Sequence, residues 1–157
     1  MKEEENKTHI DKDYFEVNYS DLEYVTPDGK YYRPSIQEFH IGYQFEQYNG
    51  YDWVKRNFEN LNGIYNLENA INQNVIRVKL LDREDIESFG FEHVGSLWFK
   101  SKNSDHAIRK WKGFEVDIYG DYSYRDIPGH DKQCIFRGQI KNKSELKKIL
   151  QMIGVIV

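Results

Sequence analysis

Residues 133–154 read QCIFRGQIKNKSELKKILQMIG, and this stretch decides the predicted fold class. Its first part, residues 133–140, has the composition of a β-strand. A helix is then predicted to open at Asn142 and to stop at Gly154. Apolar residues recur through this helix at helical spacing: Leu146, Ile149, Leu150 and Ile153. A helix with one apolar side must bury that side, so the stretch predicts a helix packed on a β-sheet.

The sheet itself is predicted from the segments upstream. Four strands separated by short connections are expected at 95–100, 107–111, 114–119 and 133–140. Short strands with short connections favour an antiparallel meander. Before them, Asp82 has the chemistry of a helix N-cap and Gly90 that of a helix stop. The predicted fold class is therefore α+β, an antiparallel β-meander packed against a C-terminal helix, with a short central helix.

The first half of the chain gives weaker signals. Residues 26–29, Thr-Pro-Asp-Gly, predict a turn that closes a hairpin onto residues 30–33, with an imperfect strand at 14–19 before it. Alternation of apolar and polar side chains predicts a strand over 36–46. Further elements are expected along this half: a helix or a strand at 51–58, a short helix at 66–73 and a strand at 75–81.

Length and charge suggest how these elements are grouped. The chain has 157 residues, which fits one domain. Residues 1–12 are predicted to be a flexible acidic tail and residues 13–157 a single α+β domain. Residues 1–74 hold 7 Lys+Arg against 14 Asp+Glu, net −7, and residues 75–157 hold 15 against 12, net +3. The domain is thus predicted to have an acidic, tyrosine-rich half, 13–74, and a helix-meander-helix half, 75–157.

Nine of the twelve tyrosines lie in the acidic half. Tyrosine beside carboxylate suits a surface that engages a basic partner, because the ring gives contact area and the carboxylate steers encounter. The predicted partner-binding residues are Tyr19, Asp21, Glu23, Tyr24, Asp28, Tyr31 and Tyr32. The alternative interpretation is that these tyrosines fill a β-core and its rim.

A basic cluster in the second half favours a different ligand. It consists of Lys100, Lys102, Arg109, Lys110 and Lys112. Cations beside the indoles of Trp98 and Trp111 can hold single-stranded nucleic acid by phosphate contact and stacking, so contact with RNA is the alternative prediction. Two observations weigh against it: the whole chain is acidic, with net charge −4, and both tryptophans are expected to point into the sheet.

Catalytic signatures are few. Cys134 is predicted to be a small apolar core residue rather than a nucleophile, and the five histidines lack metal-ligand spacing. Asp117, Asp121 and His130 supply ligand atoms on a strand end and its following loop, which keeps a metal-dependent nuclease as a weaker alternative. We therefore expect no enzyme, no cofactor and no bound metal.

Cellular location is predicted from three absences in the sequence. One cysteine cannot form an internal disulfide, no secretory leader opens the chain, and no apolar run approaches the ~20 residues of a membrane-spanning helix. We expect a soluble, cytoplasmic protein that makes no membrane contact.

Three segments carry a resemblance that goes beyond composition: EFHIGYQFE at 38–46, RVKLLDREDIESFGF at 77–91 and FRGQIKNKSEL at 136–146. They resemble segments of a family of small proteins carried by bacterial phages and integrated elements. The resemblance implies a mobile-element setting and supplies no catalytic residues. In general character, a small acidic protein of this kind is similar to anti-CRISPR inhibitors. The leading hypothesis is therefore a non-enzymatic inhibitor that binds a host protein or ribonucleoprotein, a CRISPR effector nuclease, with an RNA-targeting effector as one candidate.

Overall fold

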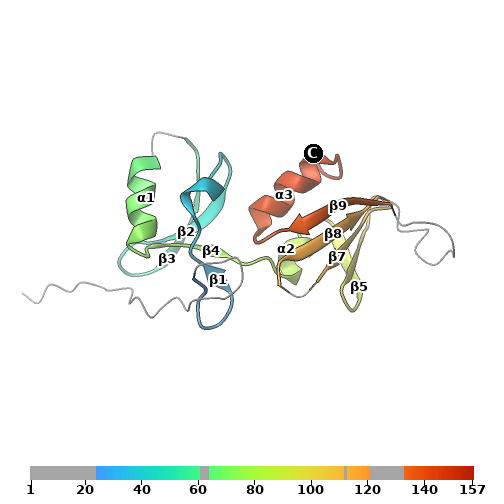
Figure 1. The fold of residues 1–157 in the computed structure, drawn as a ribbon, viewed down its shortest axis with the longest axis horizontal. Helices are drawn as coiled ribbons and strands as arrows, with labels where there is room; N and C mark the ends of the chain where they lie inside the picture. Colours follow the sequence, from blue (N-terminus) through green and yellow to red (C-terminus); the bar gives the residue numbers. More distant parts are fainter. Residues whose placement is uncertain (1–23, 61–63, 112, 121–132) are drawn as a thin grey trace, which may run out of the picture. The chain divides into compact units, whose positions relative to one another are not determined.

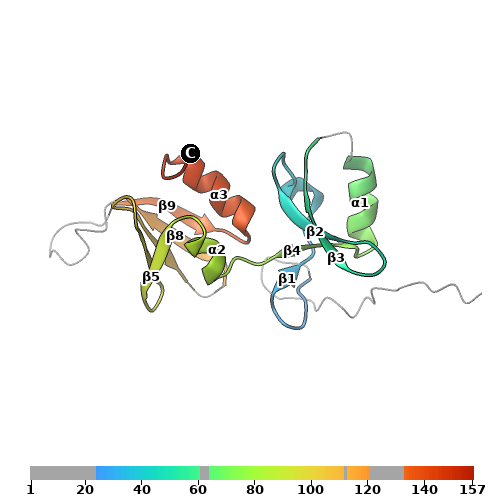
Figure 2. The same cartoon turned by 180° about the vertical axis from the view of Figure 1, so that it is seen from behind.

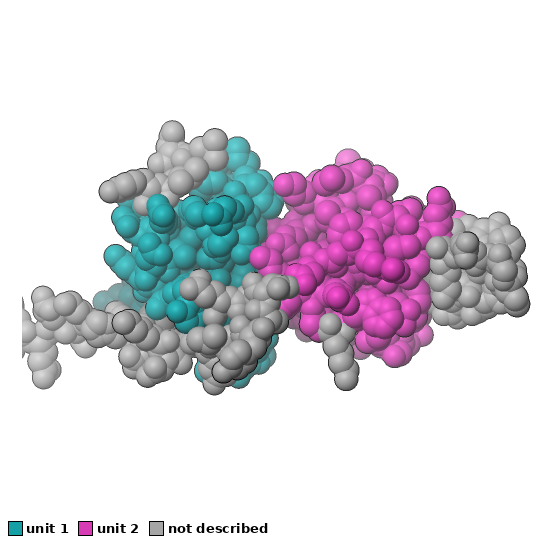
Figure 3. All heavy atoms as spheres, viewed as in Figure 1, with its two compact units in different colours: residues 1–80 teal, residues 81–157 magenta. Residues whose placement is uncertain are grey.

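The computed structural model describes residues 24–60, 64–111, 113–120 and 133–157 (Figure 1). The chain divides into two compact units between Leu80 and Leu81 (Figure 3). The sequence had suggested one domain with an internal change of character after residue 74. The boundary lies later because the strand that follows residue 74 pairs with strands of the first unit.

The first unit is built on a four-stranded antiparallel sheet in the order β1-β4-β2-β3. Its elements in chain order are β1 (Tyr31–Tyr32), the 3-10 helix η2 (Ile36–Glu38), β2 (Gln44–Tyr48), β3 (Trp53–Asn57), α1 (Ile64–Asn72) and β4 (Ile76–Lys79). Because β4 lies between β1 and β2, its two cations belong to the acidic unit. Residues 1–80 then hold 9 Lys+Arg against 14 Asp+Glu, net −5, and residues 81–157 hold 13 against 12, net +1.

The predicted turn at 26–29 is confirmed. The Thr26 hydroxyl donates to Asp28 Oδ1 at 2.6 Å, and the backbone N–H of Lys30 donates to the same oxygen at 3.0 Å. Gly29 has φ +68°, the left-handed conformation that glycine adopts without strain. Val25 bridges to Tyr32 on the far side of the turn. The strand predicted at 14–19 lies outside the described residues.

The strand predicted over 36–46 is wrong for most of its length. Residues 36–38 form η2, closed by a capping box between Ser35 and Glu38, and β2 begins only at Gln44. Between them Ile41 is 66% exposed and Gly42 has φ +87°, so the alternating residues do not follow one extended strand. The ambiguous segment 51–58 contains β3, and the helix expected at 66–73 is α1, whose Leu67 and Ile71 are buried.

The second unit confirms the predicted fold class. Its elements are α2 (Arg83–Glu87), β5 (Phe91–Gly95), β6 (Trp98–Ser101), β7 (Ala107–Lys110), β8 (Glu115–Tyr119), β9 (Cys134–Gln139) and α3 (Lys143–Met152). The strands form an antiparallel meander in the order β5-β6-β7-β8-β9, and α3 runs alongside it (Figures 1 and 2).

Sheet and helices of the second unit share one hydrophobic core. Ile108, Val116 and Ile118 of the sheet pack in the same cluster as Leu146 and Leu150 of α3. Each helix begins at a predicted cap: the Asp82 side chain accepts from the N–H of Asp85, and the Asn142 side chain accepts from the N–H of Glu145. The core face of the meander therefore lies under α3.

Two local predictions in the second unit need correction. The strand predicted at 95–100 is confirmed only over 98–100, which belong to β6; Gly95 ends β5, and the chain turns at Gly95 and Ser96, which both have positive φ. β5 itself was not predicted. Cys134, expected in the core, is exposed at the start of β9, the edge strand of the sheet.

Candidate binding face on the five-stranded sheet

A row of four side chains crosses the second sheet on the face opposite its core. Trp98 of β6 pairs with Arg109 of β7, Arg109 with Asp117 of β8, and Asp117 with Arg137 of β9. Side chains alternate along a strand, and the neighbours of Asp117 in β8 belong to the core cluster. The row therefore projects from the other side of the sheet. We call this side the polar face; its described residues include Trp98, Lys100, Arg109, Trp111, Glu115, Asp117, Tyr119, Arg137 and Gln139.

Arg109 is held between two indole rings. Its guanidinium carbon lies 3.5 Å from the ring centroid of Trp111 and 5.3 Å from that of Trp98. Such a cation–π contact fixes the plane of the guanidinium without neutralising its charge. Among the described residues Arg109 forms no ion pair, and its Nε atom is buried without a hydrogen-bond partner. A buried donor left in this state costs about 1–3 kcal/mol.

The first unit contains a matched arrangement that is complete. Arg77 lies 3.7 Å from the ring centroid of Tyr31 and 4.2 Å from that of Trp53. Its Nε donates to Glu46 Oε2 at 2.6 Å, so both the charge and the donor are satisfied within the protein. Arg77 therefore has a structural explanation. Arg109 also lies against aromatic rings but has no carboxylate partner among the described residues, which makes it the candidate for contact with an external anion.

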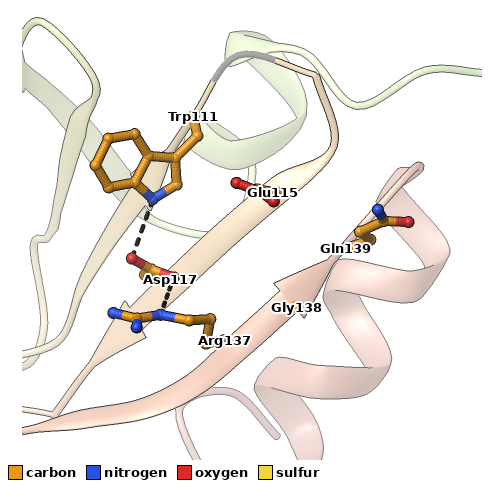
Figure 4. Close-up of a pocket in the computed structure, with 6 residues that line it drawn as sticks. All are labelled: Trp111, Glu115, Asp117, Arg137, Gly138 and Gln139. Atoms are coloured by element: carbon orange, nitrogen blue, oxygen red, sulfur yellow. Dashed lines mark hydrogen bonds and ion pairs between the residues drawn. The ribbon is translucent and has the colours of Figure 1, made fainter. Parts of the chain in front are cut away.

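Asp117 organises the centre of the polar face (Figure 4). It is 3% exposed, and its carboxylate accepts from Trp111 Nε1 at 3.0 Å, Arg137 Nε at 3.0 Å and the Tyr119 hydroxyl at 3.3 Å. Burial of the carboxylate acts to raise its pKa, but the hydrogen bonds from Trp111 and Arg137 outweigh burial and hold the pKa below its ordinary value of 3.8. Asp117 thus fixes both the Trp111 ring and the Arg137 guanidinium.

A depression of about 340 Å³ adjoins this network. It is lined by Trp111, Glu115, Asp117, Arg137, Gly138 and Gln139 (Figure 4). Glu115 of β8 pairs with Gln139 of β9, two residues along each strand from the Asp117–Arg137 pair and therefore on the same face. Arg137 is anchored at Nε, yet its side chain is 71% exposed. The depression therefore combines a fixed ring, an exposed cation and an exposed carboxylate.

The predicted nucleic-acid residues are only partly brought together. Lys100 and Arg109 share the polar face, and Lys102 is exposed just after β6. Lys110 follows Arg109 and so points to the other side of β7; its Nζ donates to the carbonyl of Gly113 at 3.1 Å, and burial lowers its pKa. Lys112 lies outside the described residues. The expectation that Trp98 and Trp111 point into the core was wrong, because both lie half-buried on the polar face.

The described members of the predicted tyrosine surface make contacts within the first unit. Tyr32 is fully buried, and its hydroxyl donates to Glu38 Oε2 at 2.6 Å, so it cannot contact a partner. Burial, with Tyr43 and Glu38 nearby, raises the pKa of Tyr32. Tyr31 packs against Arg77 and Tyr24 against Arg33, although both tyrosines stay partly exposed, while Asp28 is exposed but bound within its own turn. Tyr19, Asp21 and Glu23 lie outside the described residues.

The metal alternative gains no support from the part of the chain that the structure describes. Both oxygens of Asp117 already accept hydrogen bonds, and Asp121 and His130 are not among the described residues. Within that part, no group of three His, Cys, Asp or Glu side chains is placed to hold a metal ion.

No described helix is long and apolar enough to cross a membrane.

Comparison with known proteins assigns no family. No family model, no curated protein and no solved structure matches this chain. The candidate site therefore rests on its own geometry.

Sequence reasoning missed Asp117 and Arg137 as binding-face residues and did not consider Glu115. A usable signal was present: Asp117 stands between Val116 and Ile118, so it must occupy the second face of an otherwise apolar strand. Its partners on adjacent strands depend on register, which the sequence does not give.

Proposed function

We propose that this protein is a non-enzymatic binding protein that holds single-stranded nucleic acid on the polar face of its second sheet. The observation that carries the proposal is Arg109, an arginine fixed between two indoles with no carboxylate partner among the described residues. A phosphate oxygen is a suitable acceptor for that guanidinium, because arginine binds phosphate with charge-assisted hydrogen bonds.

The neighbours of Arg109 suit a strand rather than an isolated anion. Lys100 and Arg137 place exposed cations on the same face, and Trp111 lines a depression beside them, where a base can stack on the ring face that Arg109 does not cover. Bases of a single strand are free to stack on aromatic side chains, whereas those of a duplex are not. Three cations on one sheet face are a small number, so the proposal is for moderate affinity that weakens with salt.

Fluorescence anisotropy with labelled RNA and DNA 12-mers tests this proposal. Three phosphate contacts give a slope of about −2 for log affinity against log salt, so binding should weaken roughly twentyfold between 50 and 200 mM salt. Arg109→Gln should weaken binding about tenfold at low salt and reduce the slope by about 0.7. Lys147→Gln, which removes an exposed cation from α3, is the matched control and should change little. Failure of the wild type to bind either strand, or equal binding by a folded Arg109→Gln variant, would refute the proposal.

A second candidate function is inhibition of a host CRISPR effector nuclease. Its support is the acidic balance of residues 1–80, net −5, together with the resemblance to phage proteins. An acidic surface can occupy a basic nucleic-acid channel. Affinity purification from host lysate should then recover a nuclease or ribonucleoprotein. Charge reversal at Asp21, Glu23 and Asp28 should abolish that complex, and an unaffected complex would eliminate these residues as its contact surface.

A further inference from the structure

The exposed carboxylate of Glu115 is not explained by phosphate binding. It lines the depression beside Trp111 and Arg137, where its negative charge opposes the approach of an anion. No hydrogen bond or ion pair engages its side chain among the described residues. A surface built only to attract phosphate gains nothing from a carboxylate at this position. Glu115 therefore points to a ligand group that donates hydrogen bonds.

We infer that the depression accepts a guanine base of the bound strand, and that the Glu115 carboxylate accepts hydrogen bonds from the edge of the base that carries N1–H and the 2-amino group. This inference rests on the proposed function, because the base is delivered by a strand held at Arg109. Guanine presents an N1–H and a 2-amino group side by side, and a carboxylate can accept from both at once. Bidentate reading of this kind discriminates between bases by about 1–3 kcal/mol, or roughly five- to 150-fold.

The other walls of the depression suit the rest of a purine. Trp111 supplies a flat ring whose position is fixed by its 3.0 Å hydrogen bond to Asp117 (Figure 4). Arg137 supplies donors for the acceptor side of guanine, and it is held by the same Asp117 carboxylate. A volume of about 340 Å³ accommodates one base together with water. The depression thus offers a ring on which the base can stack and polar groups that can hydrogen-bond to it.

The remaining bases match this lining less well. Adenine and cytosine each present one amino donor beside a ring acceptor, and that acceptor would meet the Glu115 carboxylate with repulsion. Uracil presents one N–H donor flanked by two carbonyl oxygens, which are also repelled. Glu115 therefore discriminates by attraction to guanine and by repulsion of the other three bases.

Competition between 12-mers of uridine that carry one central G, A or inosine tests the inference. The wild type should bind the G strand about tenfold more tightly than the A strand. Inosine keeps N1–H but lacks the 2-amino group, so its strand should fall between the two. Glu115→Gln should reduce the preference to within about twofold while leaving the all-uridine strand bound at least as well. Glu92→Gln, an exposed glutamate of β5 on the same face, is the control and should keep the preference.

The outcomes separate this inference from the proposed function. Equal affinity for the G and A strands, or a full preference in Glu115→Gln, overturns guanine reading and leaves strand binding intact. Absence of binding to every strand, the all-uridine one included, overturns both. A thermal melt of each variant establishes that it is folded before its affinity is compared.

Discussion

At the scale of single residues, the two sandwiched arginines distinguish structure from function. Arg77 and Arg109 have similar aromatic neighbours, but in the part of the chain that the structure describes only Arg77 has a carboxylate partner, at 2.6 Å. Arg77, whose charge is satisfied within the protein and whose side chain is only 12% exposed, is explained by the fold. Arg109 is not, and this difference is the basis for placing the binding face on the second sheet.

Asp117 supports that face, so its removal should affect stability. Asp117→Asn replaces one carboxylate oxygen with an amino group, which cannot accept a hydrogen bond from Trp111, Tyr119 or Arg137. The free energy of unfolding should therefore fall by about 1–3 kcal/mol at pH 7. Urea unfolding followed by tryptophan emission measures it. Asp105→Asn, at an exposed site, is the control and should change the free energy by less than about 0.5 kcal/mol. An unchanged midpoint in Asp117→Asn would contradict the supporting role.

The lowered pKa of Asp117 also predicts a pH dependence. A carboxyl whose pKa is lower in the folded state adds stability that is fully present above its ordinary value of 3.8 and is lost as the pH falls through the folded value. Wild-type stability should therefore fall more steeply below about pH 4 than that of Asp117→Asn. Parallel acid-dependence curves for the two proteins would show that Asp117 does not contribute.

At the scale of elements, prediction succeeded where local chemistry decides and failed where tertiary pairing decides. Asp82 and Asn142 cap their helices as expected, because capping is a short-range interaction. The strand predicted over 36–46 followed apolar alternation, but Ile41 is exposed and the chain turns at Gly42. The row from Trp98 to Arg137 needed strand order and register, and neither can be read from local sequence.

The cap of α3 supplies a test at this scale. Asn142 is 1% exposed, and its side chain accepts from the N–H of Glu145 at 2.9 Å. Asn142→Ala removes the cap and should lower the free energy of unfolding by about 0.5–2 kcal/mol. Lys148→Ala, at an exposed position of the same helix, should be close to neutral. Equal melting temperatures for Asn142→Ala and wild type would contradict the assigned helix start.

At the scale of the whole molecule, the chain comprises two compact units, each with its own sheet. The charge asymmetry predicted from sequence persists in reduced form, net −5 against +1, because β4 carries Arg77 and Lys79 into the acidic unit. Every described member of the core cluster of the second unit lies within residues 81–156. We therefore expect that unit to fold without the first.

A fragment of residues 81–157 should accordingly fold alone. We expect cooperative thermal unfolding and dispersed amide resonances. A fragment of residues 75–157 should be no more stable, because it carries β4 without its partners β1 and β2. A disordered 81–157 fragment, or one that gains stability from residues 75–80, would contradict the boundary between Leu80 and Leu81.

Tryptophan emission during RNA titration tests the central claim most directly. The chain has three tryptophans, and a Trp53→Phe background leaves Trp98 and Trp111, the two rings that flank Arg109. If single-stranded RNA binds on the polar face, uridine-rich 12-mers should change this emission in a saturable way, and 200 mM salt should largely reverse the change. Saturable binding by anisotropy with unchanged emission would place the strand elsewhere, and no binding at all would contradict the account.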